Sequence, residues 1–119
     1  MDDQTLELLH ANLAEVFGER DADARREAAR RTYTADVTFT DAEGTVHGWE
    51  AVATKAGALQ DGLPPGAAFA EEGPVYAGAG RAALAWRLGP ADGEPLVRGI
   101  DIVTIVDGRI SELLTLLVG

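Results

Sequence analysis

The sequence predicts a single α+β domain, because helical patterns dominate its first half and strand patterns fill its second. Apolar residues recur at helical spacing in most of the chain before residue 61, and short apolar runs typical of strands continue to residue 118. The segment DGLPPG (61–66) breaks the chain between the two halves. A length of 119 residues suits one hydrophobic core, so we expect residues 1–119 to form one domain.

Three segments have the pattern of helices. In residues 3–17 apolar side chains recur every three or four positions, and Gly18 ends the run. Residues 22–33 are rich in alanine and arginine, and their mixed charges indicate one solvated face. Residues 49–60 carry an apolar stripe that predicts a third helix packed against the core.

The remaining segments have the pattern of strands joined by turns. Residues 41–48 predict a turn with a short extended piece, and the Asp-Gly pair at 107–108 predicts a tight hairpin. The last strands are apolar on both faces, so we expect helices and a pocket on one face and a second subunit on the other. The predicted strands are 36–41, 67–72, 74–78, 81–89, 95–106 and 109–118.

Composition excludes several classes of partner and chemistry. The net charge of −10 repels nucleic acid and anionic membrane surfaces and favours a neutral or cationic small ligand or another protein. The chain has no cysteine, which excludes disulfides and thiolate chemistry. It begins with acids rather than a basic leader and has no apolar run of membrane-spanning length, so a cytoplasmic location is expected.

Two aspartates lie where a strand pattern requires apolar residues. Asp41 ends the run VTFTD, and Asp101 lies within GIDIVTIV. Alternate strand residues share a face, so Asp41 points the same way as Phe39, and Asp101 the same way as Val103. A carboxylate on an apolar face is costly unless it is paired, protonated or used. The pattern therefore indicates a pocket with acid–base chemistry.

Each aspartate also has a purely structural interpretation. Asp41 could form the turn that follows its strand. Asp101 could be a structural carboxylate bonded to a neighbour such as Tyr33 or Arg98.

Two stretches of sequence resemble a known superfamily. The run YTADVTFTDAEGTVHGWEAV (33–52), the ending GIDIVTIVDGRISEL (99–113) and the order of elements are similar to NTF2-like proteins. Within that superfamily the ketosteroid isomerases and the SnoaL-like polyketide cyclases are the most similar branches. The resemblance implies a cone, in which three N-terminal helices pack on a strongly curved antiparallel sheet around an apolar cavity. It also implies a homodimer formed through the sheet.

The resemblance assigns roles to particular residues. The general-base aspartate of the isomerases falls on Asp41, and the aspartate that stays protonated to donate a hydrogen bond to the oxyanion falls on Asp101. Tyr33 is retained, but Leu13 and Ala56 stand where the isomerases have tyrosines on the first and third helices. Loss of one oxyanion donor costs on the order of 10²–10³ in rate. The two carboxylates therefore match the isomerases better than the donor set does.

We therefore expect a small cofactor-free enzyme that isomerises or cyclises a hydrophobic carbonyl compound such as a polyketide, terpenoid or steroid. Asp41 would be the general base and Asp101 the oxyanion donor. His10 and His47 are far apart and show no metal-ligand spacing, so no metal is expected. The expected substrate-binding residues are Leu13, Phe17, Tyr33, Phe39, Ala56, Tyr76, Trp86, Val103, Leu113, Thr115 and Leu117.

Two alternatives use the same cone. The chain could be a non-catalytic module that binds a small ligand or dimerises. It could also open an epoxide, with Asp41 and either Glu71 or Glu72 as the acid–base pair.

Overall fold

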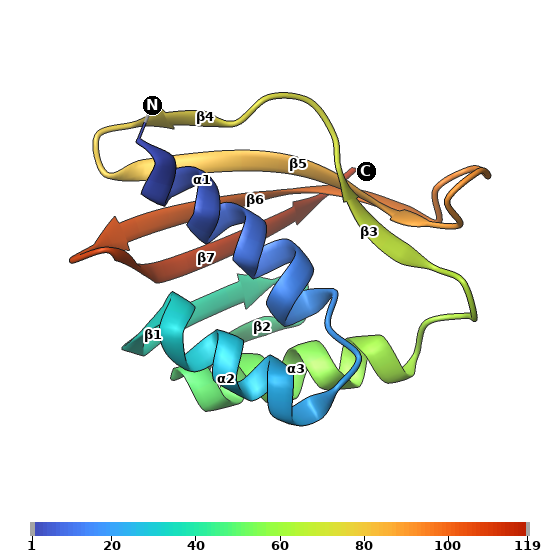
Figure 1. The fold of residues 1–119 in the computed structure, drawn as a ribbon, viewed down its shortest axis with the longest axis horizontal. Coiled ribbons are helices and arrows are strands. Elements are labelled where there is room, and N and C mark those ends of the chain that lie inside the picture. Colours follow the sequence, from blue (N-terminus) through green and yellow to red (C-terminus); the bar gives the residue numbers. More distant parts are fainter. Residues whose placement is uncertain (1, 119) are drawn as a thin grey trace.

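The computed structural model describes residues 2–118, and it shows three helical arms set against one curled sheet (Figure 1). The N-terminal arm crosses the sheet, and the other two lie together at its lower edge in that view (Figure 1). The element order is helices first, with two strands between the second and third arms, and then strands only. This is the predicted α+β order.

The N-terminal arm consists of two helical segments that follow each other without a break. α1 (Asp3–His10) is capped at its N-terminus by Asp2, whose carboxylate accepts hydrogen bonds from backbone N–H groups of the first turn. It continues as the π-helix η1 (Ala11–Phe17), whose wider turn is closed by the N–H of Gly18 donating to the carbonyl of Leu13 at 2.8 Å. The sequence predicted one helix over 3–17, and the π-helical geometry of its second half is a feature that apolar spacing does not reveal.

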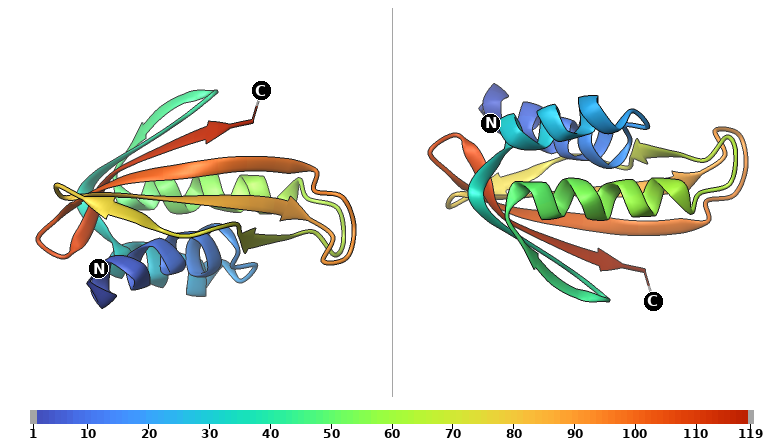
Figure 2. Two further views of the ribbon diagram at one scale, coloured as in Figure 1. Left: turned by 90° about the horizontal axis from the view of Figure 1, so that it is seen from above. Right: turned by 90° about the horizontal axis from the view of Figure 1, so that it is seen from below.

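The other helices match their predicted ranges closely. α2 (Ala22–Thr32) begins at Asp21, whose side chain accepts a hydrogen bond from the N–H of Ala24 at 2.8 Å. α3 (Trp49–Asp61) follows Gly48, whose φ of 90° is a conformation that glycine adopts readily. α2 and α3 pack side by side (Figure 2).

Seven strands form one sheet in the order β2-β1-β7-β6-β5-β3, with the short β4 also paired to β5. All pairs are antiparallel except β1 with β7, which run parallel. The sheet is thus mixed rather than purely antiparallel, because β1 and β7 come from distant parts of the chain and no hairpin joins them. The strands are β1 (Tyr33–Asp41), β2 (Gly44–His47), β3 (Ala68–Glu71), β4 (Tyr76–Gly78), β5 (Arg81–Gly89), β6 (Val97–Val106) and β7 (Arg109–Leu117).

The core lies between the N-terminal arm and the inner face of the sheet. Leu9 and Val16 from the arm are buried there, together with Val37 from β1 and Val103 from β6. Strand alternation produces this arrangement, because every second residue of β5 and β6 is buried.

The outer face of β5, β6 and β7 turns away from α1, and none of the helices within residues 2–118 covers it (Figure 2). Leu114 and Leu116 on this face are 37% and 48% exposed. Among residues 2–118, none of the helices has the length and apolar character needed to cross a bilayer.

Candidate functional site

A cavity of about 310 Å³ opens between η1, the inner face of the sheet and the C-terminal end of α3. Its walls are almost entirely apolar, and four aromatic side chains contribute to them. The volume lies at the lower end of the range for small-molecule sites. The lining residues are Leu13, Phe17, Phe39, Asp41, Ala42, Glu43, Leu59, Leu63, Phe69, Trp86, Leu88, Val97, Asp101, Thr115 and Leu117.

Asp101 is the buried polar group of this cavity, with only 6% of its surface exposed. Its Oδ1 accepts hydrogen bonds from the indole Nε1 of Trp86 at 3.0 Å and the Oγ1 of Thr115 at 2.8 Å. Its Oδ2 accepts one from the amide Nδ2 of Asn12 at 2.9 Å. β5 and β7 flank β6, so Trp86 and Thr115 approach the carboxyl from the two neighbouring strands. Asn12 approaches it from η1, which packs on the inner face of the sheet.

Burial raises the pKa of Asp101 from 3.8 to about 6, although the hydrogen bonds from Thr115, Trp86 and Asn12 lower it in part. The carboxyl therefore changes protonation close to neutral pH. A group with a pKa in this range can either donate or accept a proton with little driving force, as acid–base catalysis requires.

A second buried contact holds Asn12 in place. Its Oδ1 accepts a hydrogen bond from the hydroxyl of Tyr33 at 2.5 Å, and both side chains are fully buried. Burial, together with the nearby charge of Asp101, raises the pKa of Tyr33 well above its usual value, which keeps its hydroxyl a donor. Tyr33, Asn12 and Asp101 thus form one continuous chain of hydrogen bonds.

Asp41 lies at the mouth of the cavity, at the end of β1. Its Oδ1 accepts a hydrogen bond from the backbone N–H of Glu43 at 2.9 Å, and its Oδ2 lies 3.5 Å from the Nζ of Lys55 on α3. Lys55 also contacts the carboxylate of Glu43. Asp41 therefore both stabilises the turn after β1 and lines the cavity.

The two aspartates lie in one row across three strands. Thr115 pairs with Asp101 in the β6–β7 register. Asp41 and Thr115 each follow the last pair of the β1–β7 ladder, Thr40 with Leu114, by one residue. All three side chains line the cavity.

The structure brings together the two predicted catalytic aspartates and part of the predicted binding set. It also places in the wall seven residues that the sequence did not indicate, because their positions depend on loop paths and on the curl of the sheet. The predicted residues in the wall are Leu13, Phe17, Phe39, Trp86, Thr115 and Leu117, and the additional ones are Ala42, Glu43, Leu59, Leu63, Phe69, Leu88 and Val97.

Five predicted binding residues lie outside the wall. Val103 and Leu113 have the predicted inward orientation but belong to the packed core, because the helices fill that end of the sheet. Ala56 is buried within the core on α3, and Tyr33 contacts Asn12 instead of the cavity. Tyr76 is 67% exposed, because β4 is a short strand that pairs only with the end of β5.

Asn12 was missed as a site residue. The signal that could have found it is a polar amide on the apolar stripe of the first helix, among Leu9, Leu13 and Val16. Its importance depends on Asp101, which lies 89 residues away in the sequence. Helical periodicity alone gives no information on such a contact.

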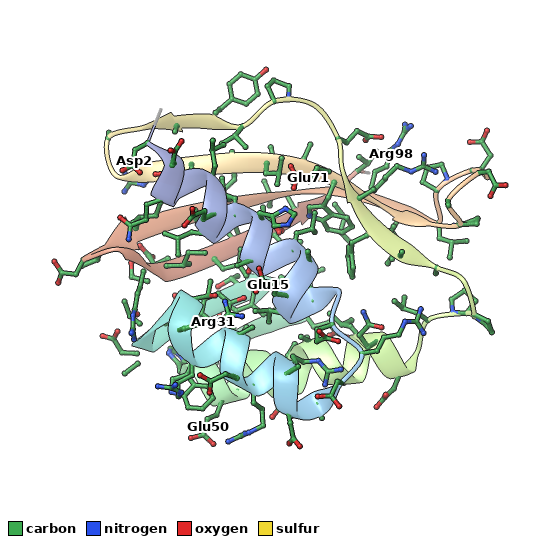
Figure 3. The ribbon with its side chains drawn as sticks, in the orientation of Figure 1. Asp2, Glu15, Arg31, Glu50, Glu71 and Arg98 are labelled. Carbon is green, nitrogen blue, oxygen red and sulfur yellow. The ribbon has the colours of Figure 1, made fainter. Side chains whose placement is uncertain are left out.

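Neither glutamate of the epoxide alternative lies in the cavity wall. The Oε2 of Glu71 lies 2.8 Å from the Nδ1 of His10 and faces α1 (Figure 3). The Oε1 of Glu72 lies 3.5 Å from the Nε of Arg98. Asp41 therefore has no glutamate partner from β3. Within residues 2–118, no cluster of His, Asp or Glu side chains has an arrangement that could hold a metal ion.

Comparison with protein families identifies the class to which this fold and cavity belong. The model of the SnoaL-like domain matches residues 11–113, which is most of the chain. The chain therefore belongs to the SnoaL-like family, as the resemblance in the sequence predicted. A search of curated proteins gives no match.

Solved structures share the fold at low sequence identity. A proposed isomerase of the SnoaL-like family from Agrobacterium tumefaciens is 24% identical, with a TM-score of 0.88, and the match covers 99% of this chain and 100% of that one. A proposed SnoaL-like polyketide cyclase from a Jannaschia species is 22% identical, with a TM-score of 0.77 over 98% and 86% of the two chains. A proposed ketosteroid isomerase from Kribbella flavida is 15% identical, with a TM-score of 0.72 over 98% and 79%. At these identities the likeness establishes the NTF2-like fold, and the activity must be argued from the site.

Proposed function

We propose that this chain is a cofactor-free enzyme that transfers a proton within a hydrophobic carbonyl substrate, giving isomerisation or cyclisation. The observation that carries the proposal is the pair of carboxyls in one apolar cavity, with Asp101 buried in the wall and Asp41 at the mouth. A polyketide, terpenoid or steroid has the apolar body and carbonyl group that such a cavity would accept.

Asp41 takes the proton from the carbon beside the substrate carbonyl, and the C–H electron pair moves to the carbonyl oxygen. The resulting enolate oxygen accepts a hydrogen bond from the protonated Asp101. Three of the four acceptor positions of the Asp101 carboxyl are filled by Trp86, Thr115 and Asn12. The remaining position is on Oδ2, so that is where its proton would lie. Asp41 then returns the proton to another carbon, which completes an isomerisation. In a cyclisation the enolate carbon instead attacks a second carbonyl carbon of the same substrate, whose oxygen takes the proton back from Asp41.

The reaction is tested with a β,γ-unsaturated ketosteroid, whose conjugated product absorbs in the ultraviolet. We expect Asp41→Asn to lower turnover by roughly 10²–10⁴, the usual contribution of a general base. Asp101→Asn should lower it by roughly 10²–10³, as expected for an oxyanion donor. The matched control is Asp36→Asn, which removes an exposed carboxylate from the same strand as Asp41.

A second assay removes the dependence on steroid shape. Deuterium incorporation beside the carbonyl of a small apolar ketone, followed by NMR in heavy water, detects proton abstraction without any rearrangement. Activity in both assays that is equal in Asp41→Asn and Asp36→Asn would refute Asp41 as the base. Absence of activity in the wild type in both assays would refute the enzymatic proposal.

The second candidate is a module that binds a small apolar ligand without turnover. Leu13 favours it, because an apolar side chain stands in the cavity wall where the isomerases carry an oxyanion-donating tyrosine. Binding of an apolar ketone without any deuterium incorporation would support this candidate over the enzyme.

A further inference from the structure

The charged residues of the cavity wall are all acidic. Asp41, Glu43 and Asp101 line it, whereas none of the lining residues is a lysine, arginine or histidine. Lys55 contacts the two carboxylates at the mouth, but Asp101 has no cationic contact among the residues that the structure describes. The wall therefore repels anions and favours a neutral or positively charged ligand.

The hydrogen bonding of Asp101 also favours a ligand that donates. An ionised carboxylate has about four acceptor positions, and Asn12, Trp86 and Thr115 fill three of them. None of the hydrogen bonds among residues 2–118 fills the remaining position on Oδ2, which leaves it to a ligand or water. A cationic N–H donor would satisfy it best, since hydrogen bonds between charged groups are about twice as strong as neutral ones.

The remaining walls are aromatic. Phe17 and Phe39 pack edge to face with ring centroids 5.3 Å apart, and Phe69 packs in the same way on Trp86, also at 5.3 Å. All four rings line the cavity. Aromatic rings attract cations and also supply apolar contact area. The net charge of −10 adds a long-range attraction for a cation.

We propose that this cavity binds a protonated apolar amine, with the ammonium group on the carboxylate of Asp101 and the apolar body against the aromatic walls. This goes beyond the proton-transfer function, because it requires no turnover and uses Asp101 as an anion. The two kinds of ligand require different protonation states of Asp101. A carbonyl oxygen binds to the protonated acid, and an ammonium group binds to the ionised carboxylate.

The two kinds of ligand therefore respond to pH in opposite directions. Since the pKa of Asp101 lies at about 6, affinity for an amine rises as the pH increases through 6, and affinity for a ketone falls. The other titratable groups that face this region are Tyr33 from β1, Asp41 at the end of β1, and Glu43 in the following turn. Lys55 from α3 contacts only the last two.

The test uses three probes of one shape: adamantylamine, adamantanol and adamantane carboxylate. Binding is measured by calorimetry with the whole chain at about pH 7.5. We expect the amine to bind roughly 10–100-fold more tightly than the alcohol, as a charge-assisted hydrogen bond implies, and the carboxylate to bind least. Asp101→Asn should bring the amine to the level of the alcohol, and Asp36→Asn should leave the preference intact.

Equal binding of amine and alcohol to the wild type would overturn the proposal. An amine preference that survives Asp101→Asn but is lost in Asp41→Asn would place the ammonium at the mouth and overturn the assignment to Asp101. Circular dichroism of each variant shows whether it is folded, and the pH dependence of the wild type tests the same claim without any substitution. None of these measurements requires catalysis. The results can therefore support amine binding even if the proton-transfer proposal is refuted, and they can refute amine binding even if proton transfer is observed.

Discussion

At the scale of single residues, Asp101 links the stability of the fold to pH. Its pKa is about 6 in the folded protein and near 3.8 in the unfolded chain. The folded state therefore keeps this proton at pH values where the unfolded chain has lost it. The stabilisation from this group is complete only below the unfolded pKa of 3.8 and is lost as the pH rises through 6.

This linkage predicts a measurable difference between the wild type and Asp101→Asn. The free energy of unfolding of the wild type, relative to the variant, should fall by roughly 2–3 kcal/mol between about pH 4 and pH 7.5. Urea unfolding at several pH values measures it. Asp36→Asn, which alters an exposed carboxylate on β1, is the control. A constant difference for Asp101→Asn would show that the carboxyl is ionised throughout.

Asn12 offers a second residue-scale prediction. Asn12→Ala removes a donor to Asp101 and leaves the buried hydroxyl of Tyr33 without its acceptor. We expect the free energy of unfolding to fall by about 1–3 kcal/mol and the pKa of Asp101 to rise, since the lost hydrogen bond lowers it. NMR titration of the aspartate carboxyl carbons measures the pKa.

The matched control for Asn12 is Tyr33→Phe, which removes the hydroxyl but keeps the amide that donates to Asp101. Its effect on the pKa of Asp101 should be much smaller than that of Asn12→Ala. Similar pKa values in both variants would mean that Asn12 does not tune the carboxyl.

At the scale of elements, the β5–β6 pair positions the indole of Trp86. Trp86 pairs with Gly99 across the two strands, and a Cβ atom added to Gly99 would lie 2.6 Å from the ring and 2.8 Å from the carbonyl oxygen of Leu116. Glycine is therefore required here by close approach rather than by backbone conformation. Any larger residue would move the indole that donates to Asp101.

Gly99→Ala should accordingly lower the free energy of unfolding by about 1–3 kcal/mol, the usual cost of overpacking. It should also change the fluorescence of Trp86, measured in a Trp49→Phe background. Gly78→Ala is the control, because nothing lies within 4 Å of its added Cβ. Equal stability and unchanged fluorescence in the two variants would mean that Trp86 is not held by this contact.

Element ranges were largely predictable, since they depend on local patterns. The structure confirms the three helical ranges to within two residues at each end, and β5 occupies the predicted 81–89. The π-helical turn of η1 was not predictable, because the hydrogen bond from Gly18 to Leu13 leaves no mark in apolar spacing. The parallel pairing of β1 with β7 was missed for a similar reason, as it joins distant segments.

At the scale of the whole molecule, the outer face of the sheet carries exposed apolar side chains that no helix of residues 2–118 covers. Leu114 and Leu116 are exposed at its centre, next to Ile100 and Ile102 on β6. Exposed apolar surface of this kind is typical of interaction sites. By strand alternation and register, Arg87 of β5 and Arg98 of β6 lie on the same face at one end of the apolar centre, and Glu112 of β7 lies at the other end. A two-fold axis that runs across the strands would bring these opposite charges together.

We propose that a second copy of this chain covers the face, and Leu114→Asp tests it. The variant should sediment as a monomer at concentrations where the wild type is a dimer, because a carboxylate buried in an apolar contact is costly. Leu96→Asp is the control, since Leu96 is 57% exposed and lies in the loop before β6. A monomeric wild type, or two variants that behave alike, would refute a dimer through this face.

The sequence by itself determined the class of fold, the places of the elements and the two carboxylates of the cavity. Side chains alternate between the two faces along a strand. Asp41 could therefore be assigned to the inner face with Phe39, and Asp101 to the same face with Val103. These properties depend on residues that are close together in the chain, so the sequence alone is enough to predict them.

Only the tertiary structure decided where the cavity ends and what surrounds Asp101. The curl of the sheet and the path of η1 bury Val103 and Leu113 in the core, yet leave Trp86 and Thr115 on the cavity wall. Asn12 reaches the carboxyl across a long separation in sequence. The pKa of Asp101 depends on burial and on donors from three different elements, and such properties exist only once those elements have packed together.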